Sequence, residues 1–308
     1  MPRLSELLDK RVVFVTGKGG VGKSTVAAAL GLKAAAAGKR TIVCEVAAQQ
    51  RVAELFGKRA GLFEEVEVAD NLWTISIEPD EALREYVLLQ LKVKAMRDLL
   101  FRSRIFTYLA AATPGLRELV TIGKVWEIAQ PDRKVRDGRR YDLVIVDAPA
   151  TGHGIAFLQT PRMYAGIARV GPIHSQAVQL DALITDHAQT GVAIVSLPEE
   201  MPVNESAALE ERLREEIGAS VDLIYMNALY PERFSAAEAK ELSALADRES
   251  GGESLAAAAA ASEHRRARTQ RAQLSRLRRR VEAPVKTLPF VFSPRLDTAA
   301  VETLGKRL

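Results

Sequence analysis

Nine consecutive residues near the N-terminus have the types and spacing of a phosphate-binding loop. The segment Gly17-Lys18-Gly19-Gly20-Val21-Gly22-Lys23-Ser24-Thr25 matches the pattern GxxxxGK[ST]. Glycines let backbone N–H groups close around phosphate oxygens at the positive end of a helix. We expect Lys23 to contact the β- and γ-phosphates and the Ser24 hydroxyl to bind Mg²⁺. The pattern therefore predicts a nucleotide site whose phosphates are bound by Gly17, Gly19, Gly20, Val21, Gly22, Lys23, Ser24 and Thr25.

Such a site also needs an aspartate at the end of a neighbouring strand. Residues 141–146 form a mostly apolar run, and Asp147 follows it directly. An acid in this place holds Mg²⁺ in nucleoside triphosphatases that have such a loop. The alternative is a turn aspartate that caps the next helix. We predict Ser24 and Asp147 as the metal-binding pair.

The elements that must position these residues alternate along the chain. Short runs rich in β-branched residues are predicted as strands, and most are apolar throughout, as in parallel sheets covered on both faces. These runs are 12–16, 41–46, 72–77, 141–146, 193–197, 221–226 and 285–290. Helical stretches separate them. The pattern predicts an α/β fold with a doubly wound, mainly parallel sheet.

The chain of 308 residues is predicted to form one domain, 1–308, with two additions. The alternation stops over about 79–130, where apolar residues recur every four positions, so an all-helical insertion is expected there. Its apolar residues either pack on the domain or line a groove for a protein client. Further on, residues 250–261, with two glycines and six alanines, are predicted as a loop. That loop would lead into an arginine-rich helix over about 262–281.

Positive charge is concentrated in this arginine-rich segment. The chain has 43 basic and 39 acidic residues, a formal net charge of +4. Eight arginines and no acid occur between His264 and Arg280, so the remainder has 35 basic and 39 acidic residues. The helix either has a solvated face, or binds nucleic acid or an anionic membrane, or pairs with an acidic partner. Nucleic acid is not expected as the main partner.

Several classes of protein are excluded by composition. The chain has one cysteine, Cys44, which excludes a disulfide framework and a CxxC zinc site within one chain. No run of 18 apolar residues occurs, so no transmembrane helix is predicted. The first residues lack the apolar core of a signal peptide. A cytoplasmic location is expected.

Two motifs carry a resemblance to a known family. Lys18, directly after the first glycine, makes the loop similar to the deviant Walker A motif of the SIMIBI ATPases. The segment Asp147-Ala148-Pro149-Ala150-Thr151-Gly152-His153 resembles the switch II sequence DTAPTGH of the ArsA/Get branch. The resemblance implies a P-loop ATPase with ATP and Mg²⁺ as ligands. It also implies a nucleotide-gated dimer, with itself or with a paralogous subunit, in which Lys18 reaches the partner's phosphates.

Further site residues follow from the same resemblance. Asn227 looks like the residue that reads adenine, and Leu288-Pro289-Phe290 resembles the loop that closes over the nucleotide. Asn227, Pro289 and Phe290 are therefore expected to contact the adenine base of the nucleotide.

The same alignment shows a departure in switch I. Ala47 stands where the branch carries the aspartate that positions the attacking water. Glu45 is the nearest acid, and it either orders the water shell of the metal or merely ends its strand. The candidate catalytic residues are thus Lys18, Lys23, Asp147 and Glu45, with slow hydrolysis expected because of Ala47.

Three functions are compatible with these features. The first is an ArsA/Get-like ATPase that acts as a switch for a protein client or partner. The second is a ParA/MinD-like positioning ATPase whose arginine-rich helix binds DNA or membrane. The third is a catalytically weak subunit of a heteromeric ATPase. The switch II match and the helical insertion favour the first.

Overall fold

The computed structural model describes residues 4–46, 50–90, 113–133, 139–247 and 251–308, and its centre is an eight-stranded sheet. The strand order is β3-β4-β2-β5-β1-β6-β7-β8, and each neighbouring pair is parallel except β3 with β4. The strands are β1 (Val12–Gly17), β2 (Thr41–Val46), β3 (Val66–Ala69), β4 (Leu72–Ile77), β5 (Leu143–Ala150), β6 (Thr190–Ser196), β7 (Leu223–Leu229) and β8 (Val285–Pro289). The predicted α/β class and mainly parallel sheet are confirmed.

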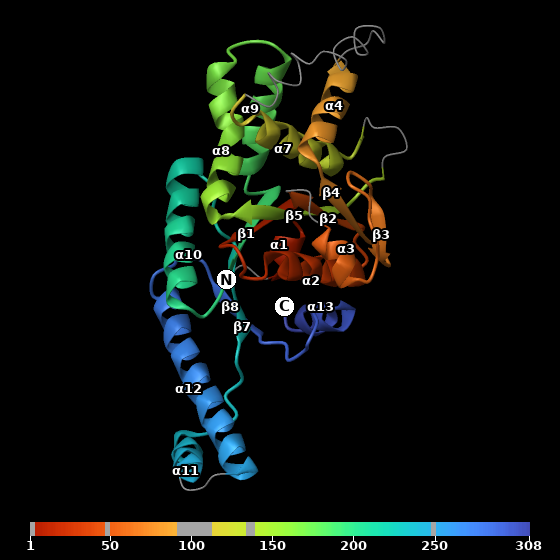
Figure 1. Cartoon of the computed structure of the whole chain (residues 1–308). Coiled ribbons are helices and arrows are strands. Elements are labelled where there is room, and N and C mark those ends of the chain that lie inside the picture. Colours follow the sequence, from red (N-terminus) through yellow and green to blue (C-terminus); the bar gives the residue numbers. More distant parts are fainter. Residues whose placement is uncertain (1–3, 47–49, 91–112, 134–138, 248–250) are drawn as a thin grey trace.

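Helices cover both faces of the sheet (Figure 1). One face carries α1 (Leu4–Leu8), α2 (Lys23–Ala36), α3 (Arg51–Leu55) and α13 (Thr298–Gly305). The other carries α7 (Leu116–Ala129), α8 (Thr151–Ile167), α9 (Pro172–Thr185) and α10 (Glu200–Arg212), which a π-helix η1 (Leu213–Ile217) follows. The remaining helices are α4 (Pro79–Gln90), α11 (Ala236–Ala246) and α12 (Gly252–Arg278).

The strand β1 shows why the sheet needs two covering layers. Its side chains alternate between two hydrophobic cores, with Val12 and Phe14 in one and Val13 and Val15 in the other. All four are at most 1% exposed. A strand buried on both faces reads as a continuous apolar run, which is the pattern that the sequence displays.

Three details of the sequence prediction differ from the structure. The strand predicted to end at residue 146 continues to Ala150, so Asp147 lies inside β5 rather than after it. The short edge strand β3 was missed because its four residues include Glu67 and are only partly buried. The prediction of a loop over 250–261 is wrong from Gly252 onward, because α12 begins there and includes the alanine stretch 256–261. Alanine has the highest helix propensity, and Ala257 and Ala261 are buried in this helix.

The two predicted additions occupy different places. In the range 79–130 the structure contains α4 and α7, and residues 91–112 between them lie outside the described part. The helix α7 covers the sheet, since Ile122, Val125 and Ile128 are fully buried in one core. The helices α11 and α12 pack on each other and extend beyond the sheet (Figure 1). Within the described ranges, the structure contains no helix with both the length and the apolar character needed to span a bilayer.

Candidate nucleotide-binding site

The predicted phosphate loop connects β1 to α2, and its backbone explains its glycines. Gly17, Gly20 and Gly22 have φ angles of +143°, +84° and +91°, which side chains rarely allow. A Cβ on Gly17 would lie 2.2 Å from the carbonyl oxygen of Val195 on β6. Gly22 is the N-cap of α2 and no side chain caps its first turn. The uncapped N–H groups at this helix start are therefore available to a phosphate.

A cavity of about 880 Å³ lies beside the loop. It has three walls: the loop with the start of α2, the helix α3 with the turn after it, and the segment before α13. The lining residues are Gly20, 22–25, Arg51, 54–58 and 295–298. A volume of several hundred Å³ is typical of sites for small ligands, so this cavity can hold a nucleotide.

Ser24 and Asp147 meet at this loop. The Ser24 hydroxyl donates a hydrogen bond to Asp147 Oδ2 at 2.5 Å, and Asp147 is 7% exposed. Its other oxygen, Oδ1, is buried and has no hydrogen-bond partner. Burial raises the pKa of Asp147, while the Ser24 hydrogen bond and the charges of Lys23 and Arg51 act in the opposite direction. A hydroxyl beside a carboxylate oxygen without a partner is a donor set that fits Mg²⁺.

This pair does not form a complete metal cage. No group of three His, Cys, Asp or Glu side chains suited to a metal occurs among the described residues. Mg²⁺ commonly binds through one or two protein ligands together with substrate phosphates and water. The residues present therefore fit a magnesium ion that arrives with a nucleotide.

The two lysines of the loop point to different places. Lys23 lines the cavity, and its Nζ donates to the carbonyl oxygen of Lys18 at 3.1 Å. Burial lowers the pKa of Lys23, which the charge of Asp147 opposes. The Lys18 side chain instead reaches α10, where its Nζ lies 2.5 Å from Glu205 Oε1 and 2.8 Å from Met201 Sδ. In this conformation only Lys23 is placed at the cavity.

Glu45 lies beneath the site rather than in it. It is on β2, in register with Asp147 on β5, and it is 1% exposed. Its Oε1 accepts a hydrogen bond from the Val52 N–H at 3.2 Å, and its Oε2 accepts one from the Thr74 hydroxyl at 3.5 Å. Burial raises the pKa of Glu45 to about 8. The carboxyl group thus contacts the start of α3 and does not line the cavity.

The residues expected at the base are divided between two places. The Asn227 amide donates to the carbonyl oxygen of Val21 at 2.9 Å, so Asn227 lies against the loop. Pro289 ends β8 beside Leu229. The Phe290 ring packs 4.7 Å from the Tyr230 ring and lines a separate cavity of about 640 Å³ next to α12. Pro289 and Phe290 are not among the residues that line the cavity at the loop.

Sequence reasoning missed three cations that line the loop cavity, namely Arg51, Lys58 and Arg295. Arg51 and Lys58 come from α3 and the turn after it, and Arg295 comes from the segment before α13. No motif contains them, because only the folded chain brings these segments to the loop. Ala47, which the sequence marked as a departure in switch I, lies outside the described residues.

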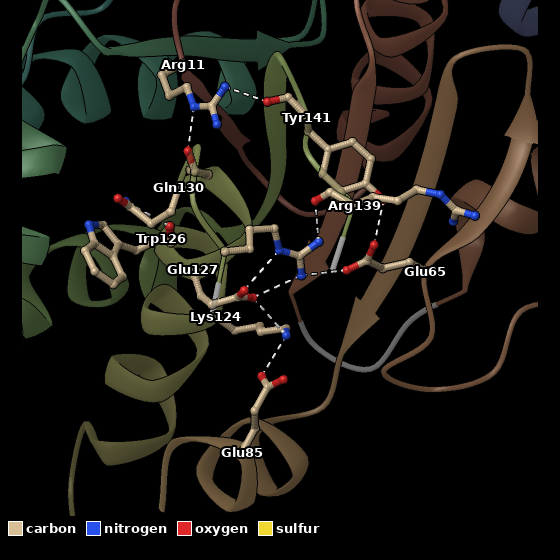
Figure 2. Close-up of polar contacts among 11 residues, drawn as sticks. Arg11, Glu65, Glu85, Lys124, Trp126, Glu127, Gln130, Arg139 and Tyr141 are labelled. Atoms are coloured by element: carbon tan, nitrogen blue, oxygen red, sulfur yellow. Dashed lines mark hydrogen bonds and ion pairs between the residues drawn. The ribbon is translucent and has the colours of Figure 1, made fainter. Parts of the chain in front are cut away.

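A second group of charged residues lies away from the loop (Figure 2). Lys124 on α7 contacts Glu85 on α4 at 2.6 Å and Glu127 at 3.1 Å. Arg133 contacts Glu127 at 3.0 Å and Glu65 at 2.7 Å. The Lys124 and Arg133 side chains are only 5% and 1% exposed. We refer to Glu65, Glu85, Lys124, Glu127 and Arg133 as the buried charge cluster.

Comparison with known proteins gives consistent matches. The model of the anion-transporting ATPase family matches residues 10–176. The ATPase BagA of Mycobacterium tuberculosis is 33% identical over 224 residues, which is 69% of this chain and 64% of that protein. A putative arsenical pump-driving ATPase of Halobacterium salinarum is 28% identical over 243 residues, 73% of this chain and 36% of that protein. The ATPase get3 of Neurospora crassa is 27% identical over 183 residues, 57% and 51% of the two chains. The chain thus covers less than two thirds of each of these relatives.

Proposed function

Because the chain belongs to the anion-transporting ATPase family, we propose that it binds Mg-ATP at residues 17–25, hydrolyses it slowly, and uses the nucleotide to control a protein partner. The observation that carries this proposal is the Ser24–Asp147 contact of 2.5 Å at an uncapped helix start. A nucleotide site needs such a hydroxyl and carboxylate next to its phosphate-binding N–H groups.

Different loop residues would bind the phosphates and the metal ion of Mg-ATP. The N–H groups at the start of α2 hold phosphate oxygens, and Lys23 exchanges its contact with the Lys18 carbonyl for the β- and γ-phosphates. Ser24 and Asp147 would hold Mg²⁺, which supplies positive charge that stabilises the phosphate oxygens during transfer. Water attacks the γ-phosphorus, the bond to the β-phosphate oxygen breaks, and ADP and phosphate leave.

Slow turnover is supported by the acids near the cavity. Glu45 is engaged by Val52 and does not line the cavity. Asp297 lines it, but its Oδ1 accepts a hydrogen bond from the Ala300 N–H at 3.1 Å as the N-cap of α13. Neither of these two is placed to orient an attacking water. Glu54 on α3 is the other acid among the described residues that line the cavity, and it lies outside the switch I position held by Ala47. We therefore expect ATP binding to be much more evident than ATP turnover.

A dimer is the second part of the proposal, and it rests on Lys18. This side chain is about one quarter exposed on the surface beside α10, at the outer side of the loop. A partner, either a second copy or a paralogous subunit, could receive Lys18 on its phosphates once the contact with Glu205 is broken. An additional cation on the transferred phosphoryl group would assist hydrolysis.

A protein client or partner is supported by an apolar surface at the connection of α8 to α9. Ile167 and Val170 are 69% and 84% exposed, and Met163 and Ile173 are at least 40% exposed. Large apolar side chains exposed close together in the sequence, as here, are the kind of feature found at interaction surfaces.

The DNA- or membrane-binding alternative receives less support from α12. Four of the eight arginines between His264 and Arg280 contact their own chain: Arg266 with Tyr230, Arg271 with Glu232, Arg276 with Glu200 and Arg280 with Asn204. The same helix packs on α10 and α11. Much of its charge therefore stabilises the fold, although Arg265, Arg268, Arg278 and Arg279 have no side-chain partner within the described residues.

The substitution Lys23→Ala tests the proposed site most directly. It removes the cation that lines the cavity at the loop, so ATP affinity should fall at least about 100-fold. The measurement is titration of a fluorescent ATP analogue in the presence of magnesium. Arg40→Ala, a change of an exposed residue outside the cavity, is the matched control. Unchanged ATP affinity in Lys23→Ala would refute the assignment of the loop.

A further inference from the structure

Arg51 is a cation that lines the phosphate site and has no side-chain partner among the described residues. It is the first residue of α3 and lines the same cavity as Lys23 and Ser24. Its side chain is exposed, and it makes no ion pair or hydrogen bond within the described part of the chain. An unpaired guanidinium at the wall of an anion-binding cavity is available to the ligand.

Arg51 lies toward the end of the cavity where the phosphates and metal would bind. Arg51 begins α3 directly before Val52, whose N–H donates to Glu45 Oε1 at 3.2 Å. Glu45 on β2 is paired with Asp147 on β5, and Asp147 contacts Ser24 of the loop. Lys58 lies in the turn after α3 and Arg295 lies before α13, so neither is connected to this pair in the same way. Of the three additional cations, Arg51 is therefore the one placed at the groups that would bind the phosphates and the metal.

Glu45 fixes the start of the helix that presents Arg51. Its buried carboxyl group accepts a hydrogen bond from the N–H of Val52, the residue after Arg51 at the start of α3. Glu45 belongs to β2 in the centre of the sheet, and its Oε2 also accepts from Thr74 on β4. The position of Arg51 is thus tied to a rigid strand, which limits the freedom that it loses on contact with a phosphate.

We infer that Arg51 contacts the γ-phosphate of ATP bound in the same subunit, and that Glu45 positions it there. This inference rests on the proposed ATP site. The cavity then distinguishes triphosphate from diphosphate through a residue of its own chain. Such a contact suits a switch that responds to ATP binding more than to turnover, because it requires no acid to activate water.

The contact is favourable for a simple electrostatic reason. The cavity wall carries four basic side chains, of Lys23, Arg51, Lys58 and Arg295, and two acidic ones, of Glu54 and Asp297. A γ-phosphate supplies the negative charge that this arrangement lacks, and ADP does not. Hydrogen bonds between charged groups contribute about 1.5–3 kcal/mol, which corresponds to roughly ten- to a hundredfold in affinity.

The test compares dissociation constants for Mg-ATP and Mg-ADP in Arg51→Gln and in Lys58→Gln. Both variants remove one positive charge from the cavity wall, so Lys58→Gln is the matched control for general electrostatics. In Arg51→Gln we expect ATP affinity to fall roughly tenfold or more and ADP affinity to change less than about twofold. In Lys58→Gln both affinities should change by one small common factor. Equal weakening of ATP and ADP in Arg51→Gln, or the same selectivity loss in Lys58→Gln, would overturn the inference.

A second pair of variants tests the role of Glu45 as a positioning residue. Glu45→Ala removes the acceptor for α3 and should reduce the ATP-to-ADP preference as Arg51→Gln does. Glu45→Gln keeps an acceptor oxygen and should restore that preference. A melting curve of each variant identifies a general loss of folding. A preserved preference in folded Glu45→Ala contradicts the positioning role.

The two proposals fail in different ways. If Lys23→Ala binds ATP normally, the ATP site itself is wrong. If Lys23→Ala loses ATP but Arg51→Gln keeps the ratio of the two dissociation constants, only the inference about Arg51 is wrong.

Discussion

At the phosphate loop, Lys23, Ser24 and Asp147 lie beside a cavity of about 880 Å³, whereas in the buried charge cluster Lys124 and Arg133 are paired with acids of their own chain. Both regions bring cations and carboxylates together. At the loop the set is incomplete, since Asp147 Oδ1 is buried without a partner. In the cluster each cation has two acidic partners.

The pKa shifts reflect this difference. Burial raises the pKa of Asp147, and the neighbouring hydroxyl and cations do not fully compensate. Burial acts on Glu65 in the same direction, but hydrogen bonds from Arg133 and Tyr141 outweigh it and lower the pKa of Glu65. A site that leaves charge uncompensated is ready for a ligand, and one that compensates it stabilises the fold.

The largest expected effect comes from breaking the cluster. Arg133→Ala leaves Glu65 and Glu127 buried without their shared cation, so the free energy of unfolding should fall by about 3–5 kcal/mol. Chemical denaturation measures it. Arg140→Ala removes an exposed arginine paired with Asp132 and should cost less than about 1 kcal/mol. Equal losses in the two variants would mean that the cluster does not hold the fold together.

A second prediction uses pH to examine the carboxyl group beneath the loop. Burial raises the pKa of Glu45 to about 8 in the folded protein, above its value of about 4.3 in an unfolded chain. Its favourable contribution is therefore complete below the unfolded pKa and is lost as pH rises through the folded one. The stability of the wild type relative to Glu45→Gln should fall by about 3 kcal/mol between about pH 5 and about pH 7.5. A difference independent of pH would show that Glu45 stays charged.

The smallest effect is expected at the outer side of the loop. Lys18 and Glu205 form a contact of 2.5 Å with side chains 28% and 36% exposed, and pairs of this kind contribute at most about 1 kcal/mol. Glu205→Gln should therefore favour ATP-dependent dimerisation only a few-fold, because Lys18 is released more easily. Light scattering over a range of concentrations measures the change, with Glu211→Gln on the same helix as control. Weaker dimerisation in Glu205→Gln would contradict a restraining role for this contact.

Much of the structure around the phosphate loop was predictable from the local sequence. The pattern of residues 17–25 predicted the loop, and the apolar run before Asp147 predicted the strand on which Asp147 lies. The predicted family is confirmed by the match over residues 10–176. The turn between β1 and α2 was predictable because its glycines, at fixed spacing, adopt backbone angles that side chains rarely allow.

The charge cluster was not predictable in the same way. Its residues come from the segment before β3, from α4, from α7 and from the turn after α7. Glu65 and Arg133 are 68 positions apart in the chain and 2.7 Å apart in space. No spacing rule relates them, so each one reads as an ordinary surface charge.

The sequence by itself determined the phosphate loop, the alternation of strands and helices, and the strand that holds Asp147. Only the tertiary structure decided that Lys23 faces the cavity while Lys18 turns to Glu205, and that Arg51 stands at the cavity wall. The physical reason is the range of the interactions involved. Backbone conformation and hydrophobic periodicity act between near neighbours in the chain, whereas charges pair wherever the packing of separate elements brings them together.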